Sequence, residues 1–595
     1  MAGEDLLSAL SDDLLRRILH FVPFKEAAST SVLSRRWGSL WRSSGAVNLA
    51  VRIHNGKGIG DYSKIEDALL SHRDAFVRAA EAALDAADAP VTRLTLHVED
   101  PGGGGVTDQS TYNFFHLRSH DRNYKEHDVL IRPLLSHPAV ARVEEFRVAA
   151  GRGAGGAASA PSEEQCDRYR TRYRLRSLPS KALRVLDIAG CSDLTPPATA
   201  AFPLLETLRL RDCSVQASDA QALIDAAPRL AAVRLESVFF KGSRSWAAAG
   251  APACVRLRCR AATELVLEFC GMEGQVIFGD RGSIEIDAPR LRYFRYKGSE
   301  RRFSLASPAP DMAALELHFV ECRYHRHGSR YDEDRTRVLF WQFVRNFAHA
   351  RALTLRVNRL EDIAVGKARR AELLCTFRNA ARLELDGAHH PTSKAAAVAI
   401  ANLLRCCPAV RDLRLNLSTV PSSAVKDIRY GQPFLKRKDQ LDYEKSVGRF
   451  MCRHRLDPAL ISLDHEDKHG DEGADGIPGL SGHSLTCLQS SLRRVGLQFR
   501  LDDPSCFGVR LVKFFTGNAK VLEEIRVDSG NRKLCEHMNL DIERWIAPAS
   551  SKVCLKRKNL EESSWEFSEI PRKSPNPTTD LIGLATSFTV VPLER

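Results

Sequence analysis

The sequence predicts an α/β protein in which a small N-terminal helical unit precedes a long, irregular solenoid of repeats built on a curved parallel sheet. The chain has 595 residues, too many for one compact core unless the protein is an elongated repeat array. Apolar residues recur at helical spacing between residues 10 and 42. From about residue 90 a short motif returns, in which an apolar residue and two variable residues precede an apolar-x-apolar triplet.

The N-terminal unit is predicted to contain three short helices. Ser11 is expected to begin the first by accepting a hydrogen bond from a free backbone N–H. Pro23 is expected to end it, because the residue before a proline is driven out of the α region. A second helix is expected from about Lys25 to Leu33, and Ser34 is placed to cap a third.

The apolar content of this unit is high for its size. Two of the six tryptophans, Trp37 and Trp41, lie four residues apart and share a helix face with Leu40. About forty residues bury too little surface to be stable alone, yet large apolar side chains occur on more than one helix face. We therefore expect the unit to dock on something, either the domain that follows or another protein.

The residues of this unit also carry a family resemblance. The stretch LSALSDDLLRRILHFVPFKEAASTSVLSRRWGSLW resembles the F-box of plant F-box/leucine-rich-repeat proteins, in the helix LSDDLLRRIL, the proline-ended turn and the segment SRRW. Ser11 stands where the family usually has proline, and both residue types suit a helix start. The resemblance covers about residues 7–50. It implies docking on a Skp-family adaptor, which links the chain to a cullin–RING ubiquitin ligase.

The resemblance assigns nine residues by position to the adaptor-facing surface or to the core of the unit. The sequence does not separate these two roles. Trp41 lies outside the SRRW segment and is expected to pack where the unit joins the rest of the chain. The nine residues carried over as adaptor-binding are Leu10, Leu14, Leu15, Ile18, Leu19, Pro23, Val32, Leu33 and Trp37.

The main body of the chain is expected to be a solenoid over residues 91–420, with a helical linker at 51–90 after the F-box at 1–50. The motif is clearest in LRVLDIAGC and LETLRLRDC, whose middle leucines, Leu186 and Leu208, are 22 residues apart. This period matches leucine-rich repeats. Each repeat is predicted to contribute one parallel strand, and neighbouring repeats stack because none can cover its own apolar face. The expected shape is an irregular horseshoe.

The residues between the inward leucines are expected to line the concave side of the solenoid. Its central strands are rich in cations, set against Glu236 and Glu268. Arginine forks suit carboxylate and phosphate groups, so a basic middle favours an acidic or phosphorylated target segment. The candidate substrate-binding residues are Arg209, Arg211, Arg234, Arg295 and Lys297.

The C-terminal third departs from the motif. Residues 421–482 are strongly polar and are predicted to be an inserted loop, which we expect to be flexible because of its low hydrophobicity. Residues 483–547 are expected to hold further repeats. Within them, 507–528 should form a helix running into a strand, and this stretch resembles the FBD segment of plant F-box/repeat proteins. An irregular tail is expected at 548–595.

Bulk composition narrows the partners and the compartment. The net charge is 87 − 74 = +13, but aromatic residues make up only 7% and no basic stripe is interleaved with them, which disfavours nucleic acid. The acidic N-terminus does not resemble a signal peptide, and no stretch approaches the ~18 apolar residues of a membrane span. Fifteen cysteines without framework spacing fit reduced thiols in the cytoplasm or nucleus.

Several short motifs match active-site or targeting patterns without the context these need. GRGAGG at 151–156 is followed by no helix that could hold a pyrophosphate. HEDKH at 465–469 runs into glycine and lacks a firm helix for zinc. The LKRK clusters at 435–438 and 555–558 are interpreted as solvated surface rather than import signals. Cys191 and Cys213 are expected to pack rather than bind metal, because no CxxC pair occurs.

The sequence therefore predicts the substrate-recognition subunit of an SCF-type E3 ubiquitin ligase, with no catalytic residues, no cofactor and no metal. Its F-box would bind the adaptor and its repeats a target protein that the sequence does not identify. Two alternatives stay open. One is an F-box receptor that needs a hormone or an inositol phosphate, and the other is a repeat scaffold that does not promote degradation.

Overall fold

The computed structural model describes most of the first 420 residues and selected parts beyond them. The predicted loop at 421–482 and tail at 548–595 lie outside the described residues, apart from 477, 480, 554 and 555. HEDKH also lies outside them, as does GRGAGG after residue 152. The described residues are 7, 9–53, 62–100, 107–116, 130–152, 173–179, 181–196, 200–241, 254–272, 282–320, 333–390, 394–419, 477, 480, 485–499, 507–528 and 554–555.

The N-terminal unit is helical and has a small core of its own. Its elements are α1 (Asp12–Leu19), α2 (Phe24–Ser29), a 3₁₀ turn η1 (Thr30–Val32) and α3 (Trp37–Leu40). Leu15, Leu19, Ala27, Trp37 and Leu40 form a buried cluster that is separate from the core of the sheet. The unit thus has an interior, but a small one.

Two details of the first helix differ from the expectation. Ser11 does occupy the N-cap position, with extended backbone at φ −67° and ψ 156°, but its side chain makes no capping hydrogen bond. The helix ends at Leu19 rather than at Pro23, which instead forms the N-cap of α2. The proline therefore starts the second helix, a place where its fixed φ costs nothing.

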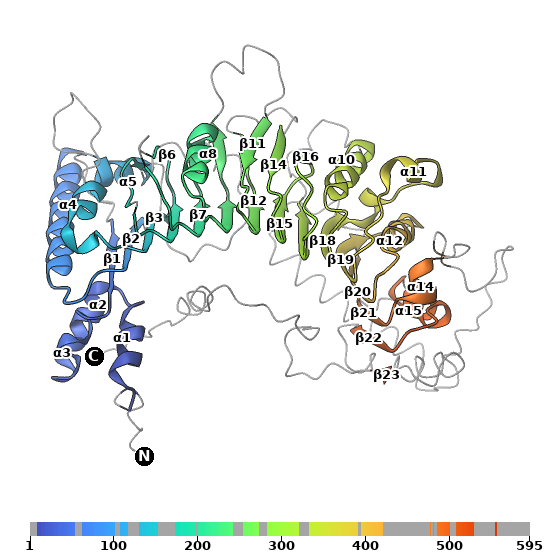
Figure 1. Ribbon diagram of the computed structural model, residues 1–595, viewed down its shortest axis with the longest axis horizontal. Coiled ribbons are helices and arrows are strands. Elements are labelled where there is room, and N and C mark those ends of the chain that lie inside the picture. The colour runs from blue at the N-terminus through green and yellow to red at the C-terminus, as the bar shows by residue number, and fades with distance from the viewer. Residues whose placement is uncertain are drawn as a thin grey trace, which may run out of the picture.

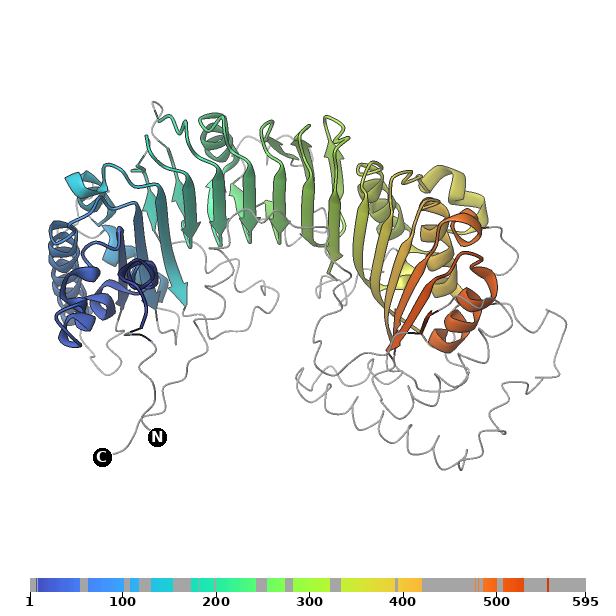
Figure 2. The ribbon, with the colours of Figure 1, turned by 60° about the horizontal axis from the view of Figure 1, so that its bottom comes forward.

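A 15-stranded parallel sheet forms the body of the protein. Its strands follow chain order, so each strand pairs with the next one of the sheet along the sequence. Figure 2 shows the described elements bent into an arch. The strands are β1 (Ala46–Arg52), β2 (Arg93–Asp100), β3 (Glu145–Arg152), β5 (Val185–Ala189), β7 (Thr207–Arg211), β9 (Ala232–Glu236), β12 (Glu264–Glu268), β15 (Tyr293–Gly298), β17 (Ala314–Phe319), β18 (Ala352–Arg359), β19 (Arg382–His389), β20 (Asp412–Thr419), β21 (Arg494–Gln498), β22 (Glu524–Asp528) and β23 (Cys554–Leu555).

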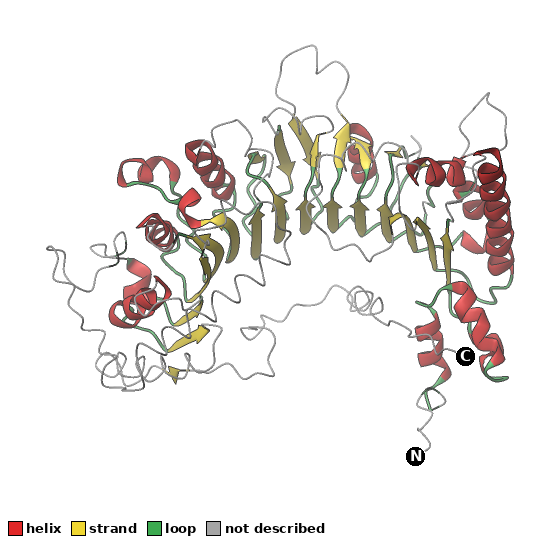
Figure 3. Cartoon of the chain, turned by 180° about the vertical axis from the view of Figure 1, so that it is seen from behind, coloured by secondary structure: helices red, strands yellow, loops and turns green. Residues whose placement is uncertain are grey.

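Helices and three smaller sheets lie along the outer side of the arch, and the large sheet lines its inner side (Figure 1). The view from behind separates helices and strands by colour and shows the same layering (Figure 3). The outer helices are α4 (Tyr62–Asp85), α5 (Thr107–His116), α6 (Ile131–Ser136), α8 (Ala217–Asp225), α10 (Glu333–Arg345), α11 (Arg370–Leu373), α12 (Lys394–Cys406), α14 (Thr486–Ser490) and α15 (Phe507–Asn518). The outer strands are β4 (Arg174–Leu175), β6 (Asp193–Leu194), β8 (Ser214–Gln216), β10 (Phe239–Lys241), β11 (Cys254–Arg258), β13 (Gly271–Met272), β14 (Ser283–Asp287) and β16 (Arg302–Leu305).

The repeating motif produces this layering through the two-residue period of a strand. In β7, Leu208 and Leu210 are buried toward the outer layer, while Arg209 and Arg211 point to the inner side. Four central strands are followed by residues with positive φ: Gly190 (76°), Asp212 (50°), Ser237 (54°) and Phe269 (52°). This left-handed residue turns each chain out of its strand and toward the outer layer.

The cysteines of the motif pack in the interior, as expected. Cys191 and Cys213 are each 1% exposed, directly after the left-handed residue. Burial, and then the neighbouring Cys213, raise the pKa of Cys191 well above its ordinary value. The thiol therefore stays protonated and acts as a small apolar side chain.

The sheet begins earlier than the predicted boundary at residue 91. β1 pairs with β2 along its whole length, from Ala46↔Arg93 to Arg52↔Glu99. The segment predicted as a helical linker at 51–90 therefore contains the end of a strand and a crossover helix. In α4, Phe76, Ala80 and Leu84 are buried in the main core, so the helix belongs to the repeat body.

The C-terminal elements extend the same sheet. Residues 507–528 form α15 followed by β22, the predicted helix and strand. The inner face of α15 buries Leu511, Val512 and Phe515, all at 0% exposed. Within the described part of the chain, no helix has the length and apolar content of a membrane span.

Candidate docking surfaces

Helix α1 carries apolar side chains on two faces. Leu15 and Leu19, four residues apart, are 0% and 2% exposed and fill the core of the N-terminal unit. One position earlier, Leu14 and Ile18 are 48% and 43% exposed, and Phe21 continues this face at 36%. One face builds the unit, and the other meets solvent.

A second exposed apolar pair follows α2. Val32 is 87% exposed and Leu33 is 64% exposed. Arg36 ties this segment to the start of α1, because its Nε donates to Asp12 Oδ1 at 2.7 Å and its Nη2 to the carbonyl oxygen of Leu10. These contacts join the chain just after the pair to the start of α1.

These side chains form what we call the apolar face, defined as Leu7, Leu14, Ile18, Phe21, Val32 and Leu33. In the described part of the chain, they are the large hydrophobic side chains that are exposed. Isolated exposed leucines need no explanation, but their concentration in one small unit marks an interaction site. The N-terminal unit, which is too small to be stable alone, therefore also carries the exposed apolar surface.

The structure divides the nine residues predicted to bind the adaptor. Leu14, Ile18, Val32 and Leu33 are exposed, whereas Leu10 and Pro23 are partly buried. Three belong to the core and cannot touch a partner directly: Leu15, Leu19 and Trp37, which is 7% exposed. The apolar face also includes Leu7 and Phe21, which the sequence analysis did not single out. Phe21 follows Leu14 at i+7, a helical spacing that the sequence does contain.

The N-terminal unit is latched to the sheet through Asn48 of β1. The Nδ2 of Asn48 donates to the carbonyl oxygens of His20, at 2.9 Å, and Val22, at 3.0 Å. Its Oδ1 accepts from Thr95 Oγ1 at 2.8 Å on the neighbouring strand. Asn48 is only 9% exposed, so one buried amide joins the turn after α1 to two strands of the sheet.

Trp41 packs at the same junction, where it was expected. Its ring meets Phe24 edge-on, with 5.3 Å between ring centroids. The gap between the unit and the sheet measures only about 10 Å³. It is bordered by these two rings, by Val47 of β1 and by Ala83 of α4. The unit and the first repeat are therefore in close contact.

The inner face of the sheet carries ion pairs between strands, and these include the predicted basic residues. Arg209 binds Glu236 through two hydrogen bonds, Nε–Oε1 at 3.0 Å and Nη2–Oε2 at 3.1 Å. Arg211 donates from Nε at 3.2 Å and from Nη2 at 3.0 Å to Oδ1 of Asp187. The side chain of Asp187 is only 4% exposed, so this arginine neutralises a buried carboxylate.

The next cations along the sheet follow the same pattern. Arg234 Nε lies 2.8 Å from Glu264 Oε1, and Arg295 Nε lies 2.9 Å from Glu268 Oε1. Four of the five residues proposed to attract an acidic segment thus already hold carboxylates of their own sheet. The predicted basic middle is a charge-balanced ladder.

Lys297 differs from the other four. Among the residues that the structure describes, it makes no ion pair, and its Nζ lies over the ring of Phe269, 5.0 Å from the centroid. In the sheet register it stands beside His318 of β17, which stands beside Arg356 of β18. Arg356 Nε reaches Asp386 only at 4.0 Å.

Burial, reinforced by nearby cations, sets the protonation state of His318. Burial lowers the pKa of His318 to about 4, with Lys297, Arg356 and Arg295 acting in the same direction. The ring is therefore neutral at physiological pH. A neutral imidazole among cations can donate one hydrogen bond without adding charge.

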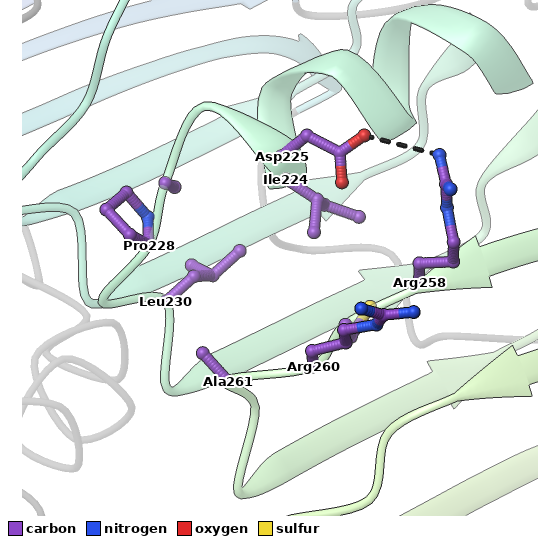
Figure 4. A pocket seen from close by; sticks show the side chains of 9 residues that line it. Ile224, Asp225, Pro228, Leu230, Arg258, Arg260 and Ala261 are labelled. Carbon is purple, nitrogen blue, oxygen red and sulfur yellow. Dashed lines mark ion pairs between the residues drawn. The ribbon is translucent and has the colours of Figure 1, made fainter. Parts of the chain in front are cut away.

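A separate cavity of about 300 Å³ lies on the outer side of the arch, beside the end of α8 and the turn after β11 (Figure 4). Ile224 and Leu230 line it, and Arg258 stands opposite Asp225 at 3.6 Å. Arg260 pairs with Asp287 at 3.2 Å. The volume is at the lower end for ligand pockets, and both arginines have carboxylate partners. It gives the small-molecule alternative little support.

Metal binding has no candidate group in the described part of the chain. No cluster of three or more His, Cys, Asp or Glu side chains there is arranged to hold a metal ion. The surfaces described above can bind partners through apolar contact and charge.

Comparison with known proteins identifies the N-terminal unit. The family model for the F-box domain matches residues 7–46. An FBD-associated F-box protein of Arabidopsis thaliana is 42% identical over 77 residues, which is 12% of this chain and 16% of that protein. An F-box/FBD/LRR-repeat protein of the same species is 60% identical over 37 residues, 6% of this chain and 9% of that protein.

A longer match extends further into the chain. A putative F-box/FBD/LRR-repeat protein of Arabidopsis thaliana is 29% identical over 126 residues, 20% of this chain and 25% of that protein. The chain therefore spans a quarter or less of the length of these curated relatives.

Proposed function

The chain carries an F-box domain at its N-terminus, and from this we propose that it is the substrate-recognition subunit of an SCF-type E3 ubiquitin ligase. F-box domains bind Skp-type adaptors. The observation that carries the proposal is the apolar face, because Leu14, Ile18, Val32 and Leu33 stay exposed within a unit that has its own core. A protein partner of matching apolar surface would cover them.

Within this proposal, the nine residues can be divided between contact with the adaptor and packing in the core of the unit. Leu14, Ile18, Val32 and Leu33 contact the adaptor, and Leu10 and Pro23 border the contact. Leu15, Leu19 and Trp37 hold the helices in the geometry that presents those side chains. Burial supports this division, since the last three are 7% exposed or less.

The parallel sheet supports the interpretation of the body as a leucine-rich-repeat horseshoe that holds the target on its inner side. Its strands are parallel and follow chain order, with leucines packed against the outer layer and polar residues on the inner face of the arch. In this scheme the F-box occupies about residues 1–50 and the repeats run to about 420. The elements at 485–528 form the FBD-like end, covering the last strands as terminal repeats must.

The proposed mechanism is proximity without catalysis by this chain. The adaptor fixes the chain to the cullin–RING ligase, and the repeats hold a target near the ubiquitin thioester. This raises the effective concentration of target lysines, and needs neither cofactor nor metal. We place this activity in the cytoplasm or nucleus.

Co-purification tests the proposal. Tagged full-length chain, expressed in plant cells, should capture a Skp-family adaptor and a cullin, whereas the variant Leu14→Asp/Ile18→Asp should capture neither. The control Lys25→Asp changes an exposed residue of the same unit, on α2, that does not belong to the apolar face. Retention of adaptor by the Leu14/Ile18 variant, or its absence from the wild type, would rule the proposal out.

Proximity labelling separates degradation from scaffolding. With the proteasome inhibited, labelled targets should become more abundant around the wild-type chain but not around the Leu14→Asp/Ile18→Asp variant. A scaffold that does not promote degradation would show the same targets at the same level with and without inhibitor.

A further inference from the structure

On the inner face of the described sheet, cationic and imidazole nitrogens occupy neighbouring positions where the contacts to carboxylates are fewer and longer than in the charge ladder. They lie on β15, β17 and β18, where Lys297, His318 and Arg356 occupy paired positions in register. Neighbouring strands are about 4.8 Å apart, so the three side chains form a short row. Each is partly exposed on the inner side.

This row is distinct from the charge ladder beside it. In the ladder, Arg209 and Arg211 each make two hydrogen bonds to a carboxylate, at 3.0 to 3.2 Å. In the row, Lys297 has no ion pair with any described residue, and Arg356 reaches Asp386 only at 4.0 Å. The Arg356 side chain is 52% exposed, so its guanidinium remains open to a further acceptor.

Phe269 adds a second, independent observation. Three other strands are followed by an equivalent turn residue, which is Gly190, Asp212 or Ser237. These are small residues that tolerate a left-handed backbone. Phe269 takes the same conformation at φ 52°, where a bulky side chain is disfavoured. Its ring lies against the Lys297 ammonium at 5.0 Å. The ring is therefore held in a disfavoured backbone conformation at a point where it supports the Lys297 ammonium.

We propose that Lys297, His318 and Arg356, supported by Phe269, form an anion-binding subsite that receives a carboxylate or phosphate group on a peptide segment of the target protein. Lys297 and Arg356 supply the charge, and the neutral His318 between them donates a hydrogen bond. The inference rests on the proposed function, because only under that function is the bound protein a target of the ligase. It moves the binding site away from Arg209, Arg211 and Arg234, which were the expected residues.

Fluorescence anisotropy on the full chain bound to its adaptor tests the subsite. Three labelled peptides share one sequence except for a central pair, which is glutamate, phosphoserine or serine. The glutamate peptide, the phosphoserine peptide or both should bind saturably, and the serine peptide should not. The tighter of the two charged peptides shows which source of anionic oxygen the subsite prefers.

Matched variants decide whether binding is local. Lys297→Gln/Arg356→Gln should raise the Kd of the charged peptide at least tenfold. Arg229→Gln/Arg290→Gln removes the same charge from exposed turn positions away from the row and should change the Kd less than twofold. Equal weakening in both double variants would mean general attraction to a basic chain and would overturn the subsite.

Phe269→Ser separates a binding defect from a folding defect. Serine occupies the equivalent turn at Ser237, so this variant should be at least as stable as the wild type. It should still weaken peptide binding several-fold, because Lys297 loses its support. Unchanged binding in this variant, or no saturable binding of either charged peptide, contradicts the proposal.

Adaptor capture, measured on the same preparations, distinguishes the two levels of the account. Adaptor capture without peptide binding overturns the subsite alone. Loss of adaptor capture by the wild type overturns the function on which it rests.

Discussion

At the scale of single residues, α1 shows how one position along a helix changes the role of a leucine. Leu15 is fully buried, whereas Leu14 beside it is 48% exposed. Removing atoms from a packed core costs transfer free energy and leaves a cavity, but trimming an exposed side chain costs neither. The same substitution should therefore lower the free energy of unfolding much more at Leu15 than at Leu14.

Leu15→Ala is expected to destabilise the F-box unit by about 2–5 kcal/mol, and Leu14→Ala by less than about 0.5 kcal/mol. Thermal or urea unfolding, followed by the fluorescence of Trp37, measures the difference. Each variant serves as the control for the other, since both lose the same atoms. Equal destabilisation would mean that α1 does not have one buried and one free face.

His318 predicts a specific pH dependence. Its folded pKa is about 4, because burial and the nearby cations disfavour the charged ring. In the unfolded chain a histidine titrates near 6.5. Between these values the unfolded chain binds a proton that the folded chain does not, so this residue lowers the free energy of unfolding as pH falls from about 6.5 to about 4.

His318→Gln should remove that contribution. The difference in urea midpoint between variant and wild type is expected to shift in favour of the variant on going from pH 7 to pH 5. Other titrating groups cancel in this comparison. Parallel pH profiles for the two proteins would show that His318 titrates normally in the folded chain.

At the scale of elements, the junction between the F-box and the sheet is built from few contacts, and one residue carries several of them. Asn48 satisfies two backbone carbonyls after α1 and one hydroxyl of β2. Leaving such buried groups unpaired costs about 1–3 kcal/mol. The latch therefore sets how firmly the F-box unit is held against the sheet.

Asn48→Ala is expected to speed hydrogen exchange in residues 12–29 without changing it in β7 and β9. Thr95→Val removes only the hydroxyl contact and should have a smaller effect. Exchange that speeds equally across the whole sheet would assign Asn48 to general stability rather than to the latch.

The two tryptophans of the F-box unit, one in α3 and one at its C-cap, pack in different places. Trp37 is 7% exposed in the core of the unit, whereas Trp41 packs on Phe24 at the junction. Trp37→Ala should weaken adaptor binding more than Trp41→Ala, measured by titration of purified adaptor. Trp41→Ala should mainly loosen the junction. The reverse order of affinities would contradict this division.

The helices of the F-box could be predicted from the sequence, but not which face of each helix is buried. Leu14 and Ile18 have the same spacing and chemistry as Leu15 and Leu19, so only packing decides which pair is buried. The predicted boundaries placed β1 in the F-box at 1–50 and the linker at 51–90, outside the solenoid. Its pairing with β2 depends on contacts across about 45 residues, which no local pattern reports.

At the scale of the whole molecule, the chain joins two surfaces of different chemistry. The helical unit that carries the apolar face lies at one end of the arch (Figure 1), and the Lys297–His318–Arg356 row lies on β15, β17 and β18, near the middle of the strand order. A parallel sheet that follows chain order gives such a molecule a continuous core between the two.

The overall plan followed from the repeat period, but the charge pattern on the inner face did not. The pairs Arg209–Glu236 and Arg234–Glu264 join residues 27 and 30 apart, and form only because of the register between strands. From the sequence these arginines formed a basic patch. In the structure they are neutralised, and only Lys297 of the five predicted residues remains without a carboxylate.

The central claim is that the apolar face binds a Skp-family adaptor, and calorimetric titration of purified adaptor into the full-length chain tests it most directly. The account predicts one-to-one binding that Ile18→Asp/Leu33→Asp weakens at least a hundredfold, while Lys297→Gln/Arg356→Gln leaves it unchanged. Undiminished binding by the Ile18/Leu33 variant, in a protein with wild-type unfolding, would contradict the account.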